Sequence, residues 1–379
     1  YNQETEGVRT DARVCNLSYL QTDWYIDQMR RPAYDSPSLP ISWTRLQYVT
    51  GTREGIPVQP DALQQVIDYY KDSPEDLKQM LGDNPYELKN IIRHWVLNDN
   101  PDLQIFPTDS IVVTVDKEAV KRSGMMIAAD SIPDVMHISL KGKRAVYKSE
   151  MMMLEMISQA NWERPLYMST TVGPDNYGHL GDNFVQEGLA CRITPFDTKQ
   201  SGRTIDSERM YNNMMNKFKY GGLKENPDIY LDETVIRMCY THRRLFNQLA
   251  QQLLKEGQKD KALKVLQRAE EEIPGSIVPH EAFYGHSLEL ADAWLALGHK
   301  AEAEKLLNAV GQNAREYIEW YLSLNTQRLL QSSRECLMQI YILNDIAKTW
   351  EPIDKKKAET YRMEVNNYAS RCHQRGMSL

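Results

Sequence analysis

The arrangement of apolar residues around two glycines, Gly257 and Gly298, constrains the fold of this chain more than any other feature of its sequence. Before and after each glycine, apolar residues recur at intervals of three or four positions. This spacing is typical of two amphipathic helices joined by a tight turn, in which the glycine forms a left-handed cap. The alanine five positions after each glycine, Ala262 or Ala303, lets the two helices approach closely. The pattern therefore predicts two helical hairpins of the tetratricopeptide type. The matching apolar residues, which stand seven, four and three positions before each glycine and five, eight and nine positions after it, are Ala250, Leu253, Leu254, Ala262, Val265 and Leu266 in the first copy and Ala291, Trp294, Leu295, Ala303, Leu306 and Leu307 in the second.

The two glycines are 41 residues apart (298 − 257), which is longer than the usual repeat of about 34 residues. The Pro274–Pro279 segment explains the excess, because it ends a helix and adds a loop. Helical periodicity continues to the C-terminus, so we predict that residues 234–379 form an α-solenoid of two or three helix pairs. The concave face of such an array either binds a protein or peptide partner or packs against a neighbouring domain, and the sequence leaves both readings open.

Residues 1–233 show a different pattern, in which short β-branched runs alternate with amphipathic helices. This alternation predicts a mixed α/β sandwich domain, so that the chain as a whole is α/β followed by all-α. The expected strands are Arg13–Ser18, Ile111–Val115, Val135–Leu140, Pro165–Thr171 and Leu189–Ile193. The expected helices are Asp23–Arg30, Asp61–Tyr70, Tyr86–Leu97 and Lys148–Ala160.

The beginning of the chain suggests that it is a fragment or a processed product of a longer protein. It opens with Tyr1 rather than Met and has no basic segment of the kind that begins a signal peptide. The first expected strand lies within a dozen residues of Tyr1. We therefore expect the α/β domain to lack an N-terminal piece.

Composition disfavours several classes of protein. The net charge of −7 argues against a nucleic-acid partner, because phosphate contacts require a basic surface. No apolar run approaches the roughly 20 residues of a membrane-spanning helix. The five cysteines lack the close pairing that zinc sites usually show. We expect no metal site, no cofactor and no nucleic-acid partner.

Motifs that would carry catalysis are missing or incomplete. The sequence contains no GxSxG elbow, no phosphate-binding P-loop and no GxGxxG turn. His280 and Glu281 begin like a zinc-protease helix, but Tyr284 stands where the second histidine belongs. Paired acids for sugar chemistry are matched only loosely by Asp182, Glu187 and Asp197. We favour the interpretation that these three residues are ordinary surface carboxylates. We therefore predict no catalytic residue within this chain.

Three segments are more specific than these motifs. They are Glu6–Tyr25 (EGVRTDARVCNLSYLQTDWY), Asn161–Thr170 (NWERPLYMST) and Phe184–Arg192 (FVQEGLACR). Together they resemble the soluble C-terminal region of a family of polytopic bacterial membrane proteins. That family is related to the eukaryotic protein O-mannosyltransferases that modify plexin-type receptors. The resemblance covers essentially the whole chain, with mild departures at Thr10 and Ala12.

The resemblance implies that this chain is the periplasmic part of a membrane glycosyltransferase that uses a lipid-linked sugar donor. In such enzymes the catalytic acid lies on an extracytoplasmic loop between early transmembrane helices, outside the present chain. The chain would reach the membrane only through a preceding transmembrane region. The resemblance therefore implies an accessory role, in which this region positions the acceptor protein. The alternative is a non-catalytic scaffold of the cell envelope that docks partners through its helical repeats.

Four charged residues in the matching segments are candidates for binding a polar ligand. Arg9 and Asp11 precede the first expected strand, and Glu187 and Arg192 flank the last one. If both strands belonged to one sheet, these charges would line one edge of it. The competing interpretation, which we favour, is structural: Arg9–Glu187 or Arg192–Asp11 ion pairs would hold loops together.

Two tryptophans in the same segments also have two interpretations. Trp24 and Trp162 lie in the stretches that carry the resemblance. Exposed aromatic rings can stack on sugars, whereas buried ones contribute to the core. We predict that both tryptophans are core residues.

Overall fold

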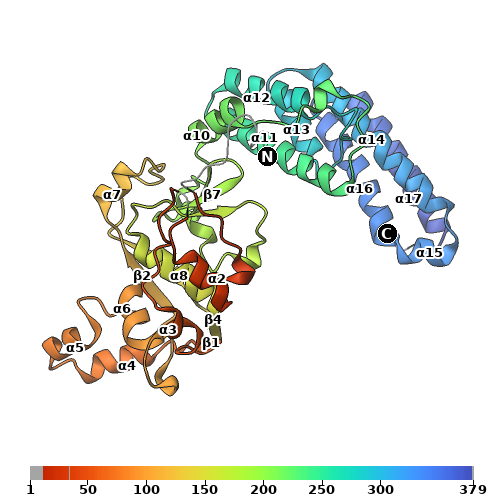
Figure 1. Cartoon of the computed structure of the whole chain (residues 1–379). Coiled ribbons are helices and arrows are strands. Elements are labelled where there is room, and N and C mark those ends of the chain that lie inside the picture. The colour runs from red at the N-terminus through yellow and green to blue at the C-terminus, as the bar shows by residue number, and fades with distance from the viewer. Residues whose placement is uncertain (1–11, 34, 378–379) are drawn as a thin grey trace. The chain divides into compact units, whose positions relative to one another are not determined.

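The computed structural model describes residues 12–33 and 35–377, and the chain divides into two compact units. The first unit is Tyr1–Asp206 and the second is Ser207–Leu379 (Figure 1). The predicted boundary after residue 233 lies inside the second unit, at the start of its first long helix. A mixed α/β unit followed by a helical unit confirms the predicted fold class.

In the described part of the first unit, the strands form three small antiparallel sheets rather than one large one. In the first sheet, β1 (Gly55–Pro57) pairs with β4 (Ala145–Tyr147). In the second, β2 (Ser110–Thr114) pairs with β3 (Val135–Ser139), with Ser110 opposite Ser139. The third has the order β5-β7-β6 and is built from Tyr167–Ser169, Ala190–Ile193 and Phe184–Gln186.

Helix α8 (Lys148–Ala160) runs through the core of the first unit (Figure 1). It is buried on nearly all sides, which is typical of a helix enclosed by a domain. Even the Glu155 carboxylate is fully buried, and it accepts hydrogen bonds of 2.6 Å from the backbone N–H and the hydroxyl of Ser42. A buried carboxylate needs such partners to offset the loss of water. The other helices described in this unit are α2 (Asp23–Met29), α3 (Arg45–Val49), α4 (Ala62–Tyr69), α5 (Pro74–Leu81), α6 (Leu88–Ile91), α7 (Lys117–Arg122) and α9 (Thr198–Ser201), with the π-helix η2 (Ile92–Val96) and the 3₁₀ turns η1 (Leu17–Tyr19), η3 (Pro101–Leu103), η4 (Pro174–Asn176) and η5 (Gly181–Asn183).

One expected strand is wrong. Residues 12–16 form no strand, and Leu17–Tyr19 form the 3₁₀ turn η1. The Asn16 side chain accepts a hydrogen bond of 2.9 Å from the backbone N–H of Ser18. A local side-chain bond of this kind competes with strand pairing and favours a turn.

In the described part of the second unit, all regular structure is helical. Figure 1 shows its long helices packed side by side. The pairs in closest contact are α11 with α12, α13 with α14, and α16 with α17. Cys336 of α16 and Cys372 of α17 are buried with their sulfur atoms 3.9 Å apart, and burial raises the pKa of the Cys336 thiol to about 12. The helices are α10 (Ser207–Asn212), α11 (Glu233–Lys255), α12 (Lys259–Glu272), α13 (Ser287–Ala296), α14 (Lys300–Ser323), α15 (Thr326–Gln331), α16 (Ser333–Trp350) and α17 (Lys355–Gln374), with the π-helix η6 (Asn213–Lys217) and the 3₁₀ turn η7 (Leu223–Glu225).

The two glycine-centred hairpins have the same turn geometry. Gly257 lies between α11 and α12 with a φ of +74°, and Gly298 lies between α13 and α14 with a φ of +82°. The residue after each glycine donates a backbone hydrogen bond to the carbonyl five positions earlier, at 2.8 Å and 2.9 Å respectively. This is the bonding expected of a glycine-terminated helix. Ala262 and Ala303 are fully buried on the second helix of each hairpin.

Candidate functional site

The central strand of the third sheet carries a buried arginine. Arg192 of β7 lies opposite Tyr167 of β5 and Val185 of β6, and only 1% of it is exposed. Its guanidinium lies 3.8 Å from the carboxylate of Glu187 and donates a hydrogen bond of 3.1 Å to the carbonyl of Ser123. The Tyr167 hydroxyl donates to the second Glu187 oxygen at 2.8 Å. These contacts compensate two charges that would otherwise be costly to bury.

The structure therefore brings together two of the four charged candidates, Glu187 and Arg192. Arg9 and Asp11 lie outside the described residues, so the predicted Arg9–Glu187 and Arg192–Asp11 pairs stay untested. The ligand-binding role of the four residues also stays a prediction.

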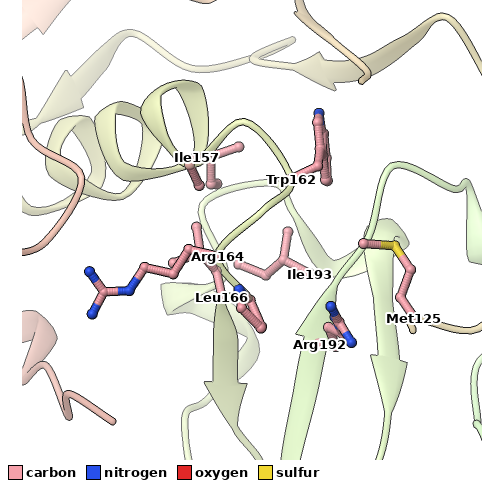
Figure 2. A pocket seen from close by; sticks show the side chains of 9 residues that line it. Met125, Ile157, Trp162, Arg164, Leu166, Arg192 and Ile193 are labelled. Carbon is pink, nitrogen blue, oxygen red and sulfur yellow. The ribbon is translucent and has the colours of Figure 1, made fainter. Parts of the chain in front are cut away.

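A small pocket lies beside Arg192, and Figure 2 shows Ile157, Trp162, Leu166 and Ile193 around it. Its volume is about 20 Å³, which suffices for about one water molecule. This pocket is therefore too small for a sugar or a peptide.

The two tryptophans of the matching segments differ in burial. Trp162 is 8% exposed and donates a hydrogen bond of 2.8 Å to the carbonyl of Thr114, as a core residue would. Its φ of +62° is unusual for a bulky side chain. The prediction is wrong for Trp24, which is 55% exposed and packs against the rings of Tyr19 and Tyr25. The buried side of the short helix α2 consists of Tyr25, Ile26 and Met29, and Trp24 does not belong to it.

A larger open groove lies elsewhere on the first unit. Its volume is about 670 Å³, within the range of small-molecule sites. Three separate segments form it: β3 with the loop before it, the turn around η5, and the stretch from Pro195 to Arg203. The polar side chains that line it include His137, Ser139, His179, Asp182, Asp197 and Arg203.

The strand β3 places two of these side chains by simple alternation. Met136 and Ile138 are buried, whereas His137 and Ser139 are exposed. Successive side chains of a strand point to opposite faces, so one face of β3 contributes to the core and the other lines the groove.

Hydrogen bonds between two segments hold the opposite wall of the groove. The Asn183 side-chain amide donates to the carbonyl of Phe196 at 3.1 Å, and the backbone N–H of Thr194 donates to the carbonyl of Asn183 at 2.9 Å. The Thr198 hydroxyl donates to the carbonyl of Asp182 at 2.8 Å. These bonds tie η5 to the segment that follows β7. Asp182 and Asp197 are therefore presented on one rigid wall.

Of the three acids noted in the sequence, two line this groove and the third does not. Asp182 and Asp197 are exposed on it, whereas Glu187 is buried against Arg192. One oxygen of Asp197 already accepts a hydrogen bond of 2.8 Å from the backbone N–H of Gln200 at the start of α9. The arrangement can bind a polar ligand.

No sequence motif marks the groove, since its walls come from separate segments. The one local signal was the alternation of His137 and Ser139 with apolar neighbours, which indicates that one face of this strand is polar. Among residues 12–33 and 35–377, no group of three or more histidine, cysteine or acidic side chains is placed to hold a metal ion.

The comparisons with known proteins bear mainly on the first unit. A family model described as TMEM260-associated domain 2 matches residues 1–213, which is more than half of the chain. No curated protein and no solved structure matches the chain. Across the part that the structure describes, we find no helix with the length and apolar character needed to cross a bilayer.

Proposed function

The chain belongs to the TMEM260-associated domain 2 family, and we propose that it is the extracytoplasmic accessory region of a membrane glycosyltransferase with a lipid-linked sugar donor. The observation that carries this proposal is the family match across residues 1–213. It agrees with the resemblance of Asn161–Thr170 and Phe184–Arg192 to the periplasmic region of such enzymes. In this proposal the catalytic acid belongs to the membrane-embedded part of the enzyme.

The second unit supports a role in positioning the acceptor. Two hairpins with the same glycine turn and the same buried alanine follow one another, in the manner of tetratricopeptide repeats. Large apolar side chains are half exposed on α14 and α16: Tyr317, Trp320 and Tyr341 are 48%, 54% and 61% exposed. Aromatic side chains of this kind are enriched where proteins bind one another.

Positioning alone can account for a large effect on rate. Holding an acceptor hydroxyl near a fixed donor converts an encounter in solution into a reaction between oriented groups. Such a region needs a surface for the acceptor and a rigid body that orients it. It needs no catalytic group of its own.

Incubation of the purified chain with a polyprenyl-phosphate sugar and candidate periplasmic acceptor proteins tests this proposal. Mass spectrometry would detect a hexose increment on the acceptor. We expect none with the chain alone, and a clear increment with membranes that contain the whole enzyme. Turnover-dependent transfer by the isolated chain would contradict the assignment of chemistry to the membrane part. If neither preparation transfers sugar and the chain still binds envelope proteins, the scaffold alternative is favoured instead.

A further inference from the structure

We propose that the groove of the first unit, lined by His137, Ser139, His179, Asp182, Asp197 and Arg203, binds a neutral saccharide. This inference deepens the proposed function, on which its biological role rests, by naming the class of ligand. The binding itself is a property of this chain that can be measured separately.

Several polar side chains on the groove are free to bind a ligand. Within the described residues, the side chains of His137, His179 and Asp182 make no hydrogen bond or ion pair. Each is exposed at the groove. Imidazole and carboxylate groups supply donors and acceptors that suit sugar hydroxyls, which both donate and accept.

The turn that carries His179 is unusual. His179 has a φ of +63° and follows Gly178, whose φ is +57°. A Cβ atom at Gly178 would lie 3.0 Å from the side chain of Met153 in α8, so the turn is packed closely on the core helix. A non-glycine residue in this conformation persists only where the surroundings enforce it. The backbone thus fixes His179 at the groove.

Charge disfavours an anionic ligand. Among the described residues that line the groove, three carboxylates, those of Asp130, Asp182 and Asp197, stand against the single guanidinium of Arg203. That guanidinium is itself engaged, because it donates a hydrogen bond of 3.3 Å to the carbonyl of Ile127. Phosphate recognition normally relies on converging cationic or backbone N–H donors. A free phosphate or a nucleotide therefore fits this groove poorly.

The apolar lining disfavours a peptide anchored by a large side chain. Among the described residues that line the groove, Phe196 is the one phenylalanine, tyrosine or tryptophan, and it is only 2% exposed. The remaining apolar lining comes from small side chains and prolines such as Ala128, Pro133 and Pro195, with Val135. Peptide recognition usually depends on apolar or aromatic pockets for anchor residues. A hydroxyl-rich neutral ligand suits this lining better.

The test is ligand-observed NMR on the intact chain with the methyl glycosides of glucose, mannose, galactose and N-acetylglucosamine and with disaccharides of these sugars. Titration of each ligand that gives a signal would then provide its Kd. We expect at least one sugar to bind. Asp182→Ala and His137→Ala should each weaken that sugar about tenfold, the cost of losing a hydrogen bond to a charged or strongly polar group. Asp182→Asn, which keeps one acceptor oxygen, should weaken it less.

The matched control is Asp72→Ala, an exposed carboxylate outside the groove. It should leave the Kd unchanged, and thermal melting should show that every variant is folded. The proposal is overturned if no sugar binds, if binding survives both groove variants, or if inorganic phosphate or a peptide occupies the groove instead. If no sugar binds but the whole enzyme carrying Asp182→Ala still modifies its acceptor, the groove inference fails while the proposed function stands.

Discussion

At the scale of single residues, burial separates charges that look alike in the sequence. Glu187 and Asp182 lie five positions apart, yet Glu187 is 5% exposed beside Arg192 and Asp182 is exposed on the groove. The difference arises because Asp182 lies in the turn η5, whereas Glu187 directly follows strand β6 and lies beside β7. The surface position predicted for these carboxylates is right for Asp182 and wrong for Glu187, because the pairing of β7 with β6 sets which carboxylate meets Arg192.

The buried pair makes a prediction about stability. Glu187→Gln keeps the size of the side chain but leaves the Arg192 charge uncompensated. We expect the free energy of unfolding of the first unit to fall by about 3 kcal/mol, as for other broken buried pairs. Chemical denaturation monitored by fluorescence would measure it.

The control for this prediction is the same substitution at an exposed ion pair. Glu163 lies 3.9 Å from Arg122, and both side chains are well exposed. Glu163→Gln should change stability by less than about 1 kcal/mol. Equal effects of the two substitutions would show that the Glu187–Arg192 pair contributes nothing specific.

At the scale of elements, the length of a segment determines how well its sequence predicts it. Helix α8 was predicted with its observed bounds, because thirteen residues carry several helical turns. Strands β1, β4 and β6 were missed, because three residues are too few to show alternation. Strand β5 is equally short, and it was expected only as part of the longer run Pro165–Thr171. Their pairing depends on partners far away in the chain, as for Gly55 opposite Tyr147.

The buried alanines of the hairpins give a prediction at this scale. Ala262 is fully buried in α12, so Ala262→Phe should overpack the first hairpin and destabilise the second unit by about 1–3 kcal/mol. Lys264→Phe, at an exposed position two residues later, controls for the lower helix propensity of phenylalanine. Thermal melting of both variants is the measurement. An unchanged melting temperature for Ala262→Phe would contradict the close helix approach.

At the scale of the whole molecule, the order of an α/β unit and a helical unit was predictable, whereas the groove was not. The change from short β-branched runs to helical periodicity is visible along the chain. The groove arises where β3, η5 and the Pro195–Arg203 stretch come together in the fold, and no local sequence pattern predicts this tertiary arrangement. Local sequence patterns in this chain likewise indicate no site of catalysis, which the proposal assigns to the membrane-embedded part of the enzyme.

The most direct test of the accessory role is to delete the second unit, residues 207–379, from the whole membrane enzyme. Two quantities would be measured in the same membranes: modification of the acceptor protein by intact-mass spectrometry, and binding of the lipid-linked donor by photo-crosslinking. If the second unit positions the acceptor, modification should fall about tenfold or more while donor binding stays at its original level. Acceptor modification at the full rate by the truncated enzyme would contradict the account.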